Sequence, residues 1–448
     1  MARGKGLGTA HILLLIFALF VGYLIYTNYA GFVPNTIIGQ DEDETYYLLH
    51  EKDTFTNFDA AYLFNMAMDI GGSIEVKDGN YLLTHPITPK SNIYMKLPSG
   101  AIITQNQPTS LEQSISLLWT EQYVENVVID GGTWDGKKGS LYDSWWIDQN
   151  RWNANFKNYM GICFYGTGQN IVVKNAYIHD VIARGIDFMG ITNGWIQNNV
   201  IIDAGDNPIT IDLNCFNVIA EYNKVTGGQD VGINTFHANN CFIRHNEVKY
   251  VMQEVHSSHW GIAAENSVGI DITDNTVSGC SCNIAVTASN DVYVAKNTID
   301  GTANQGWNHG VQAMSNTYDV KVEGNTIINC RRPLGTYPAG DNCYDIDFID
   351  NVCQGFGNNP ACEIMGRTIL IQGGSIESRS SEGCIFLNQA QNVEVRGVKF
   401  VGTNGIWDYL TRSDGVTITG CDFTQLSGTK VSVSYCSNVN IYSNVGYP

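Results

Sequence analysis

The feature that most constrains this chain is an asparagine that returns inside one short repeated pattern. The pattern reads apolar, any, apolar, any, any, Asn, any, apolar, as in IDITDNTV, which ends at Val277, and VYVAKNTI, which ends at Ile299. Most successive copies lie 22 to 29 residues apart. The recurring residues are Asn199, Asn223, Asn246, Asn275, Asn297, Asn325, Asn351 and Asn444.

Each repeat also contains a second short strand, which usually opens with glycine and a β-branched residue. Examples begin at Gly185, Gly232, Gly261 and Gly310, and alternating apolar residues around them indicate strands rather than helices. A period of this size with Gly and Asn corners predicts the coils of a parallel β-solenoid. The aligned asparagines should stack as an inward ladder, because each buried amide can then bond to the coils above and below.

The composition and the first residues predict how the chain is divided. Hydrophobic residues make up 44% and charged residues 15%, so a large core is expected and disorder is not. Arg3 and Lys5 precede an uncharged apolar run, Ile12–Tyr26, which predicts a membrane anchor or a cleaved signal and an exterior location for the rest. The expected parts are a cytoplasmic N-terminus (1–10), this segment (11–27), an acidic linker (28–45), an N-terminal cap (46–105) and the β-helix (106–448).

Charge and cysteine content limit the partners and the compartment. The 44 acidic and 25 basic residues give a formal net charge of -19, which should repel nucleic acid and anionic membrane surfaces. The 12 cysteines are typical of an exported protein. Disulfides could join Cys330 to Cys343 or Cys280 to Cys282, whereas Cys353 and Cys421 are expected to pack as free thiols.

The segment before the coils predicts a helix that closes one end of the solenoid. Residues Asp53–Ile70 have helical spacing at Phe55, Phe58, Tyr62 and Met66. A helix there would cover exposed strand edges that otherwise recruit partners. The acidic stretch Gln40–Glu44 is interpreted as part of the solvated linker.

The order of short segments at this end resembles that of a known family. A capping helix, a Gly-Gly strand, a G-x-Y hairpin, a G-x-I strand and an I-x-G-G-x-I-D-G coil correspond to Asp59–Leu63, Gly71–Val76, Gly79–Leu82, Gly100–Ile103 and Ile129–Gly136. The chain from Thr45 onward thus resembles the pectin-lyase-like superfamily. The resemblance implies an all-β, single-stranded right-handed parallel β-helix with a carbohydrate-directed role. No branch motif is intact, and this fold carries lyases, hydrolases, epimerases, esterases and non-catalytic proteins.

Residues at equal offsets from the repeated asparagine should share one face of the solenoid. Asp206 and Asp230 each follow their asparagine by seven residues, and Arg184 occupies the equivalent loop one coil earlier. Strand alternation should turn further polar side chains outward on the same face. The candidate acids, nucleophiles and bases are Asp187, Asp206, Asp212, Asp230, Arg184, His256, His259 and His309. The candidate substrate contacts are Trp260, Trp307, His237 and Glu265.

This face predicts a polysaccharide-active enzyme and leaves its reaction open. A polyuronate lyase would use calcium, with Asp206 and Asp230 as ligands, and a base for which Arg184 is best placed. A glycoside hydrolase would instead use two or three of the carboxylates without a metal. The alternative is a non-catalytic surface protein that binds glycan or has a structural role, because aspartates in turns such as Gly205–Pro208 also bond backbone amides.

Overall fold

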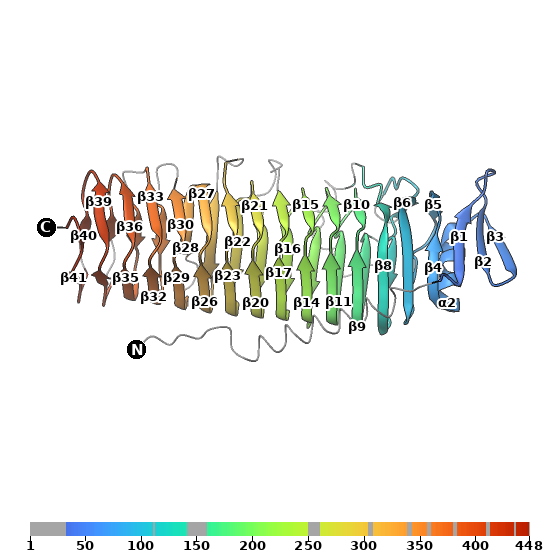
Figure 1. The fold of residues 1–448 in the computed structure, drawn as a ribbon, viewed down its shortest axis with the longest axis horizontal. Helices are drawn as coiled ribbons and strands as arrows, with labels where there is room; N and C mark the ends of the chain where they lie inside the picture. Colours follow the sequence, from blue (N-terminus) through green and yellow to red (C-terminus); the bar gives the residue numbers. More distant parts are fainter. Residues whose placement is uncertain are drawn as a thin grey trace.

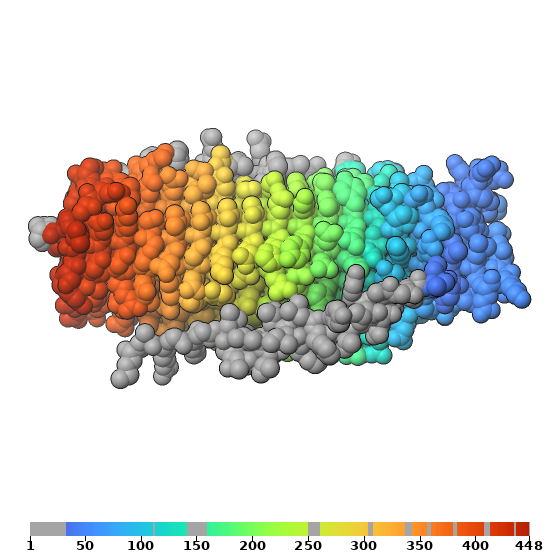
Figure 2. Space-filling view, viewed as in Figure 1, coloured from blue at the N-terminus to red at the C-terminus, as the bar shows by residue number. Residues whose placement is uncertain are grey.

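The computed structural model describes residues 33–110, 113–139, 141, 159–249, 260–302, 308–337, 343–355, 360–379, 383–408, 413–433 and 436–447. These residues form an elongated β-solenoid whose coils follow one another in sequence order (Figure 1). Figure 2 shows the same order on the surface, as bands of colour across the long axis. The expected membrane segment, residues 11–27, lies outside the described residues. None of the helices within those residues has the length and apolarity needed to span a bilayer.

Each coil contributes one strand to each of three parallel ladders, which form the sides of the solenoid. The first ladder carries the Gly-Ile strands. It contains β7 (Leu118–Thr120), the first parts of β9 (Ile162–Lys174) and β11 (Ile186–Gln197), β13 (Ile209–Asp212), β16 (Val231–Phe236), β19 (Trp260–Glu265), β22 (Cys282–Thr287), β25 (His309–Met314), β28 (Arg332–Tyr337), β31 (Cys362–Ile364), β34 (Ile385–Leu387), β37 (Ile406–Asp408) and β40 (Val431–Val433).

The second ladder carries the strands that precede the repeated asparagine. It contains β4 (Gly72–Val76), the first parts of β6 (Ile93–Gln105) and β8 (Val124–Asp135), the second parts of β9 and β11, β14 (Phe216–Glu221), β17 (Asn239–Arg244), β20 (Val268–Thr273), β23 (Asn290–Ala295), β26 (Tyr318–Glu323), β29 (Tyr344–Ile349), β32 (Arg367–Gln372), β35 (Gln391–Arg396), β38 (Thr417–Thr419) and β41 (Asn440–Tyr442).

The third ladder carries the short strands that follow the asparagine. It contains β5 (Gly79–Leu83), the ends of β6 and β8, β10 (Tyr177–His179), β12 (Val200–Ile202), β15 (Lys224–Thr226), β18 (Glu247–Lys249), β21 (Thr276–Ser278), β24 (Thr298–Asp300), β27 (Thr326–Cys330), β30 (Val352–Gly355), β33 (Ser375–Ser378), β36 (Lys399–Gly402) and β39 (Asp422–Leu426).

The predicted asparagine ladder is confirmed, at the corner between the second and third ladders. The Asn275 amide donates to the Ile243 carbonyl at 2.9 Å and to Asn297 Oδ1 at 3.0 Å. Asn275 Oδ1 in turn accepts from the backbone and side-chain amides of Asn246, at 2.9 and 3.0 Å. The same pattern runs from Asn199 to Asn351, so each buried amide in that run bonds to its stacked neighbours.

The N-terminal end differs from the sequence interpretation in two places. Helix α2 covers Ala60–Ile70, whereas Asp53–Asn57 forms strand β3. Phe55 and Phe58, expected on the helix, precede it and are exposed. The helix buries another face, made of Ala60, Ala61, Leu63, Phe64, Ala67 and Met68.

The expected acidic linker also contains ordered structure. Strand β1 (Thr36–Gln40) pairs with β2 (Tyr46–His50) and with β4. The acidic residues form the exposed turn of this hairpin, in which Asp41 Oδ1 accepts from the backbone amides of Asp43 and Thr45. The 12 cysteines are free, so neither suggested disulfide is formed, and Cys353 and Cys421 are buried as expected.

Candidate functional site

The first ladder carries most of the residues that the sequence singled out. Its register places Asp187, Thr210, Asn234 and Ala263 in one row, and Asp212 in another row with Phe236 and Glu265. Their neighbours Ile186, Ile209, Ile233 and Ile262 are buried in the core, as the alternation predicted. Asp187 is nevertheless 0% exposed, so an outward position on this face is not a solvated one.

Arg184 lies at the centre of a group of carboxylates on this face. Its Nη1 donates to Asp187 Oδ2 at 3.0 Å and to Asp212 Oδ2 at 2.9 Å, and its Nε donates to Asp206 Oδ2 at 3.2 Å. All four side chains are buried, with Arg184 the most exposed at 7%. Although burial alone would lower it, the charges of the three aspartates raise the pKa of Arg184. The guanidinium is therefore a fixed positive charge.

Apolar side chains flank these carboxylates along the row. Cys163 pairs with Asp187 and belongs to a buried group with Trp119 and Ile182. Further along, Ala263 belongs to a second buried apolar group, which also contains Val231, Cys282 and Ala285. Such surroundings disfavour an ionised carboxylate. Burial accordingly raises the pKa of Asp187 to about 6, against the opposing charge of Arg184.

Two further carboxylates lie at the partly exposed rim of this group. Asp230 directly precedes β16, and burial, followed by the charges of Asp206 and Glu265, raises its pKa to about 8. Burial also raises the pKa of Glu265, but Asn234 Nδ2 donates to Glu265 Oε1 at 2.7 Å and favours the ionised form. Because its pKa is about 8, Asp230 keeps its proton at neutral pH. We call Arg184, Asp187, Asp206, Asp212, Asp230 and Glu265 the acid cluster.

The acid cluster leaves two carboxylate oxygens unsatisfied. Asp187 Oδ1 and Asp206 Oδ1 are buried and have no hydrogen-bond partner in the described part of the chain. The nearby Thr210 Oγ1 and Asn234 Oδ1 are in the same state. Buried polar atoms in native proteins are nearly always paired, so these atoms leave hydrogen-bonding capacity unused beside Arg184.

The bonding of Asp206 disfavours the calcium site suggested at Asp206 and Asp230. Calcium takes six to eight oxygen ligands, most of them ionised. Here Asp206 Oδ2 is bonded to Arg184. The guanidinium already supplies the positive charge that a calcium ion would bring, and the two cations would repel each other.

His309 lies on the same ladder but outside the acid cluster. Successive pairings place Trp260, Cys282, His309 and Arg332 in one row. His309 is two coils beyond β19, about 10 Å at the usual strand spacing. Burial, and then the charge of Arg332, lower the pKa of His309 to about 4, so its ring is neutral at physiological pH.

The other sequence candidates divide into two sets. His237 lies in the turn after β16, with its ring 4.3 Å from that of Phe236, and Trp260 is partly buried beside Val231. His256, His259 and Trp307 lie outside the described residues.

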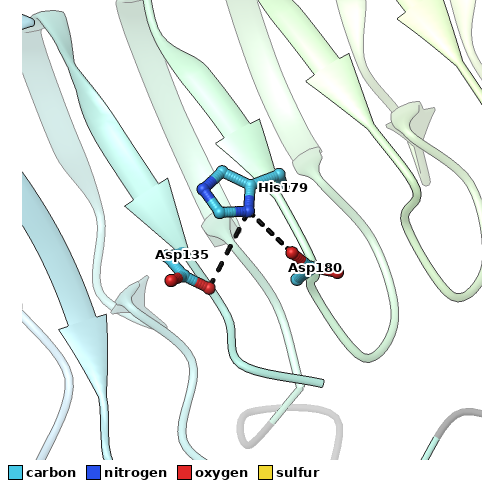
Figure 3. Close-up of side chains that lie close together, drawn as sticks. All are labelled: Asp135, His179 and Asp180. Carbon is cyan, nitrogen blue, oxygen red and sulfur yellow. Dashed lines mark hydrogen bonds and ion pairs between the residues drawn. The ribbon is translucent and has the colours of Figure 1, made fainter. Parts of the chain in front are cut away.

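A second polar group lies on the third ladder, where β8 and β10 end. Asp135 pairs with His179, and potential ligand atoms of Asp135, His179 and Asp180 lie within 4.8 Å of one another (Figure 3). His179 Nδ1 is 2.8 Å from Asp180 Oδ2 and 3.8 Å from Asp135 Oδ1. Both Asp135 and His179 occupy the same offset within their coils, so the rule that selected Asp206 and Asp230 also applies to this pair.

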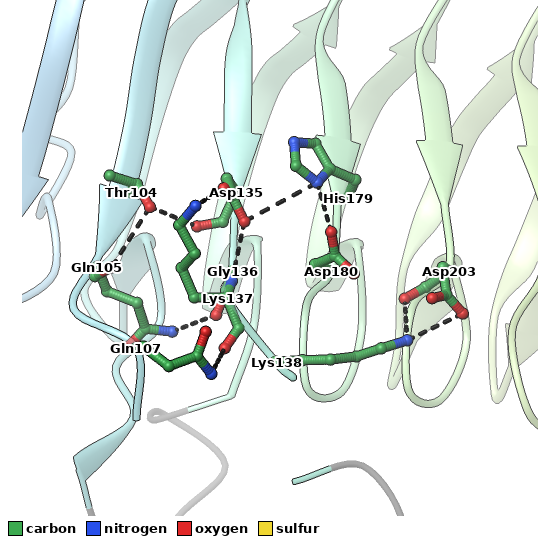
Figure 4. A network of polar contacts seen from close by, with 10 residues as sticks. All are labelled: Thr104, Gln105, Gln107, Asp135, Gly136, Lys137, Lys138, His179, Asp180 and Asp203. Carbon is green, nitrogen blue, oxygen red and sulfur yellow. Dashed lines mark hydrogen bonds and ion pairs between the residues drawn. The ribbon is translucent and has the colours of Figure 1, made fainter. Parts of the chain in front are cut away.

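One lysine pairs with this second group, and another pairs with an aspartate on the next coil. Lys137 Nζ is 2.6 Å from Asp135 Oδ2, and Lys138 Nζ is 2.9 Å from Asp203 Oδ1 (Figure 4). Gln107 fixes the loop by donating to the Lys137 carbonyl at 2.7 Å. These contacts join neighbouring turns.

Comparison with solved structures finds the same fold at low identity. The A-module of the Azotobacter vinelandii mannuronan C-5 epimerase AlgE6 is 13% identical, with 87% of this chain and 96% of that chain covered and a TM-score of 0.45. A Yersinia enterocolitica family 28 exopolygalacturonase is 11% identical, with coverage of 88% and 82% and a TM-score of 0.45. A mutant tailspike protein of E. coli bacteriophage HK620, in complex with a pentasaccharide, is 12% identical, with coverage of 86% and 77% and a TM-score of 0.52.

Sequence comparison identifies the family. No curated protein sequence matches the chain significantly. The model of the right-handed beta helix region matches residues 124–255 and 222–355, which together span more than half of the chain. These matches confirm the resemblance to the pectin-lyase-like superfamily that the N-terminal motifs predicted. The chain belongs to the right-handed β-helix family.

Proposed function

We propose that this protein is a glycoside hydrolase that cleaves a polysaccharide at the acid cluster. Asp230 donates a proton to the leaving oxygen, and Glu265, in the ionised form, activates a water molecule or attacks the sugar. Burial and then the negative charge of Asp206 keep Asp230 protonated, and Arg184 holds Asp187, Asp206 and Asp212 in place as positioning residues.

The observation that carries this proposal is the difference between the environments of Asp230 and Glu265. Two carboxylates with different proton affinities at one partly exposed rim are what acid–base cleavage of a glycosidic bond requires. The pKa of Asp230 is raised to about 8, while Glu265 accepts a hydrogen bond from Asn234. The phage tailspike, which has this fold, binds a pentasaccharide, and this supports a glycan as the substrate of the present protein.

The bonding of Arg184 favours hydrolysis over lyase chemistry. A lyase needs a base that is unprotonated and can accept a proton from the substrate. Three carboxylates raise the pKa of Arg184, so its guanidinium stays protonated. A lyase also needs a cation that faces the substrate carboxylate, and the nitrogens Nη1 and Nε of Arg184 are already directed at Asp187, Asp206 and Asp212. Hydrolysis uses the carboxylates alone.

One observation favours a non-catalytic alternative, in which the face binds glycan without cleaving it. Asp187, Asp206 and Asp212 are at most 4% exposed, so these three side chains do not reach a sugar in this structure. Catalysis must therefore depend on the partly exposed Asp230 and Glu265. Removing the carboxyl groups of Asp230 and Glu265 should abolish turnover by a hydrolase but should not abolish glycan binding by a non-catalytic protein.

The test is to incubate the full chain with neutral and acidic polysaccharides and to follow new reducing ends and unsaturated products separately. A hydrolase gives reducing ends alone, and its kcat/KM falls as the pH rises through about 8, because Asp230 loses its proton. Replacing Asp230 by Asn or Glu265 by Gln should lower kcat by about 10²- to 10⁴-fold. Replacing Asp345, which is exposed on the second ladder, by Asn should leave kcat unchanged.

Other outcomes would contradict the proposal. Unsaturated products would establish a lyase. Turnover that survives both D230N and E265Q would remove these residues from the mechanism. Glycan binding without any product, in the protein and in both variants, would favour the non-catalytic function.

The location outside the cell remains part of this proposal. It is supported by the charge pattern of residues 3–26, in which Arg3 and Lys5 precede an uncharged apolar run. Membrane fractionation of cells that express the full chain, with protease added from outside, should find the solenoid membrane-bound and accessible, or released into the medium if the segment is cleaved. Protection from external protease in intact cells would contradict an exterior location.

A further inference from the structure

A pocket of about 470 Å³ lies beside the acid cluster, at the corner where the first ladder turns into the second. It is formed by the turns of four successive coils, after β7, within β9 and β11, and after β13. Its volume is within the range of small-molecule sites. We call it the tyrosine pocket, and its principal lining residues are Tyr123, Tyr165, Gln169, Thr192, Leu213 and Asn214.

Large apolar side chains remain exposed in this pocket. Tyr123 is 54% exposed, Tyr165 is 38% exposed and Leu213 is 40% exposed. The ring of Tyr165 stacks on that of Trp119, with centroids 5.2 Å apart and planes 20° apart, so its orientation is fixed before any ligand arrives. A fixed aromatic ring with a polar tip is suited to contact the apolar face of a sugar ring.

The polar groups of the pocket are held in place and carry no charge. Glu125 accepts hydrogen bonds from Tyr123 Oη at 3.1 Å and from Gln169 Nε2 at 2.7 Å, which orients both side chains. Among the described residues that line the pocket, none bears a carboxylate, ammonium or guanidinium group. With Glu125 just behind this lining and a formal net charge of -19 on the chain, the pocket disfavours an anionic sugar and suits a neutral one.

The tyrosine pocket is directly connected to the acid cluster through Asp212. Leu213, which lines the pocket, donates its backbone amide to Asp212 Oδ1 at 2.7 Å. On the neighbouring strand, Met189 lines the pocket and pairs with Asp212. The pocket therefore lies next to the face that carries Arg184 and its carboxylates.

We propose that the tyrosine pocket binds a neutral sugar residue of the glycan, so that the substrate is a neutral polysaccharide rather than a polyuronate. This inference rests on the proposed function, from which we take the ligand to be a glycan. The ring stacks on Tyr165, and its hydroxyl groups bond to the amides of Gln169 and Asn214.

Calorimetric titration of the full chain provides the test. The probes are neutral hexasaccharides of glucose, xylose, mannose and galactose, together with hexasaccharides of galacturonate and mannuronate. At least one neutral hexasaccharide should bind, and replacing Tyr123 or Tyr165 by Ala should weaken its binding about ten-fold. Replacing Tyr165 by Phe keeps the ring and should keep the affinity. Replacing Tyr177, which is 40% exposed on β10, by Ala is the matched control and should change nothing.

Three results would overturn the inference. They are absence of binding by every neutral probe at millimolar concentration, binding that Y123A and Y165A leave unchanged, and equal or tighter binding of a uronate hexasaccharide that Y165A weakens.

The titration tests the tyrosine pocket and the hydrolysis assay tests the proposed reaction, so each proposal can be contradicted independently of the other. If Y165A weakens binding but the unaltered protein gives no reducing ends, the pocket stands and the hydrolase proposal falls. If D230N abolishes turnover but Y123A and Y165A leave both KM and the dissociation constant unchanged, the hydrolase proposal stands and the pocket assignment falls.

Discussion

Two arrays of buried polar side chains run along this solenoid, and they differ in how completely they are bonded. In the asparagine ladder, amides such as that of Asn275 donate and accept hydrogen bonds of 2.9 to 3.0 Å with the coils on both sides. In the acid cluster, Asp187 and Asp206 each bond Arg184 through one oxygen, and the other oxygen has no hydrogen-bond partner among the residues that the structure describes.

The difference follows from the chemistry of the stacked groups. An amide carries both a donor and an acceptor, so identical amides in successive coils satisfy one another and can repeat without limit. Carboxylates carry only acceptors when ionised, so stacking them raises their pKa values and requires a cation. The ladder is therefore an arrangement that stabilises the fold, whereas the acid cluster is maintained at a cost in stability, as is usual for functional sites.

The largest effect should come from removing the only cation of the acid cluster. Replacing Arg184 by Met leaves Asp187, Asp206 and Asp212 buried without a counter-charge, which should cost about 3–5 kcal/mol at pH 7. The loss should shrink as the pH falls toward 4, because protonated carboxyl groups no longer repel. Denaturant unfolding at both pH values measures it, with the partly exposed Arg396 replaced by Met as a control. A loss independent of pH would contradict this account.

Breaking the asparagine ladder should have a somewhat smaller effect that does not depend on pH. Replacing Asn275 by Ala removes its bonds to Ile243 and Asn297 and those from Asn246, which should cost about 3 kcal/mol. Replacing Asn444, half-buried near the C-terminus, by Ala should cost about 1 kcal/mol. Equal losses at the two positions would show that stacking on both sides adds nothing.

An effect of opposite sign, a gain in stability at high pH, should come from replacing Asp230. Because the folded-state pKa of Asp230 is about 8 and the unfolded value is about 3.9, its contribution is fully present below pH 4 and is lost as the pH rises through 8. Replacing Asp230 by Asn removes the ionisable group, so the variant should be more stable than the unaltered protein at pH 9, and this gain should shrink as the pH falls toward 4. Thermal unfolding from pH 4 to pH 9 measures the change, with D345N as the control. A destabilised variant at pH 9 would contradict the raised pKa.

Much of the fold could be predicted from the sequence because its determinants are local and repeated. The asparagine at each corner and the Gly-Ile strand identify the coil, and stacking then fixes the register of every ladder. The N-terminal end could not be predicted as well, because it has no repeat. There Phe55 and Phe58 mimic a helical face although they are exposed, and the helix is positioned by small residues such as Ala60 and Ala67.

The candidate site could be predicted only in part, since equal offsets place side chains on a face without fixing their partners. The offsets identified Asp206 and Asp230, and alternation identified Asp187 and Asp212. They could not show that Arg184 extends into the next coil, because that depends on burial by neighbours such as Cys163. The same reasoning grouped His309 with the aspartates, although it lies two coils beyond β19.

The stacked register also has a consequence for how such a molecule can be inherited. Thr276 pairs with Thr298, so residues 276–297 form one closed coil that starts and ends at equivalent positions. An in-frame deletion of this coil would bring β25 against β19 with the ladders continuous, and a duplication would separate them by one more coil. Gene rearrangement can thus change the length of the glycan-facing side in steps of about 4.8 Å while leaving the acid cluster untouched.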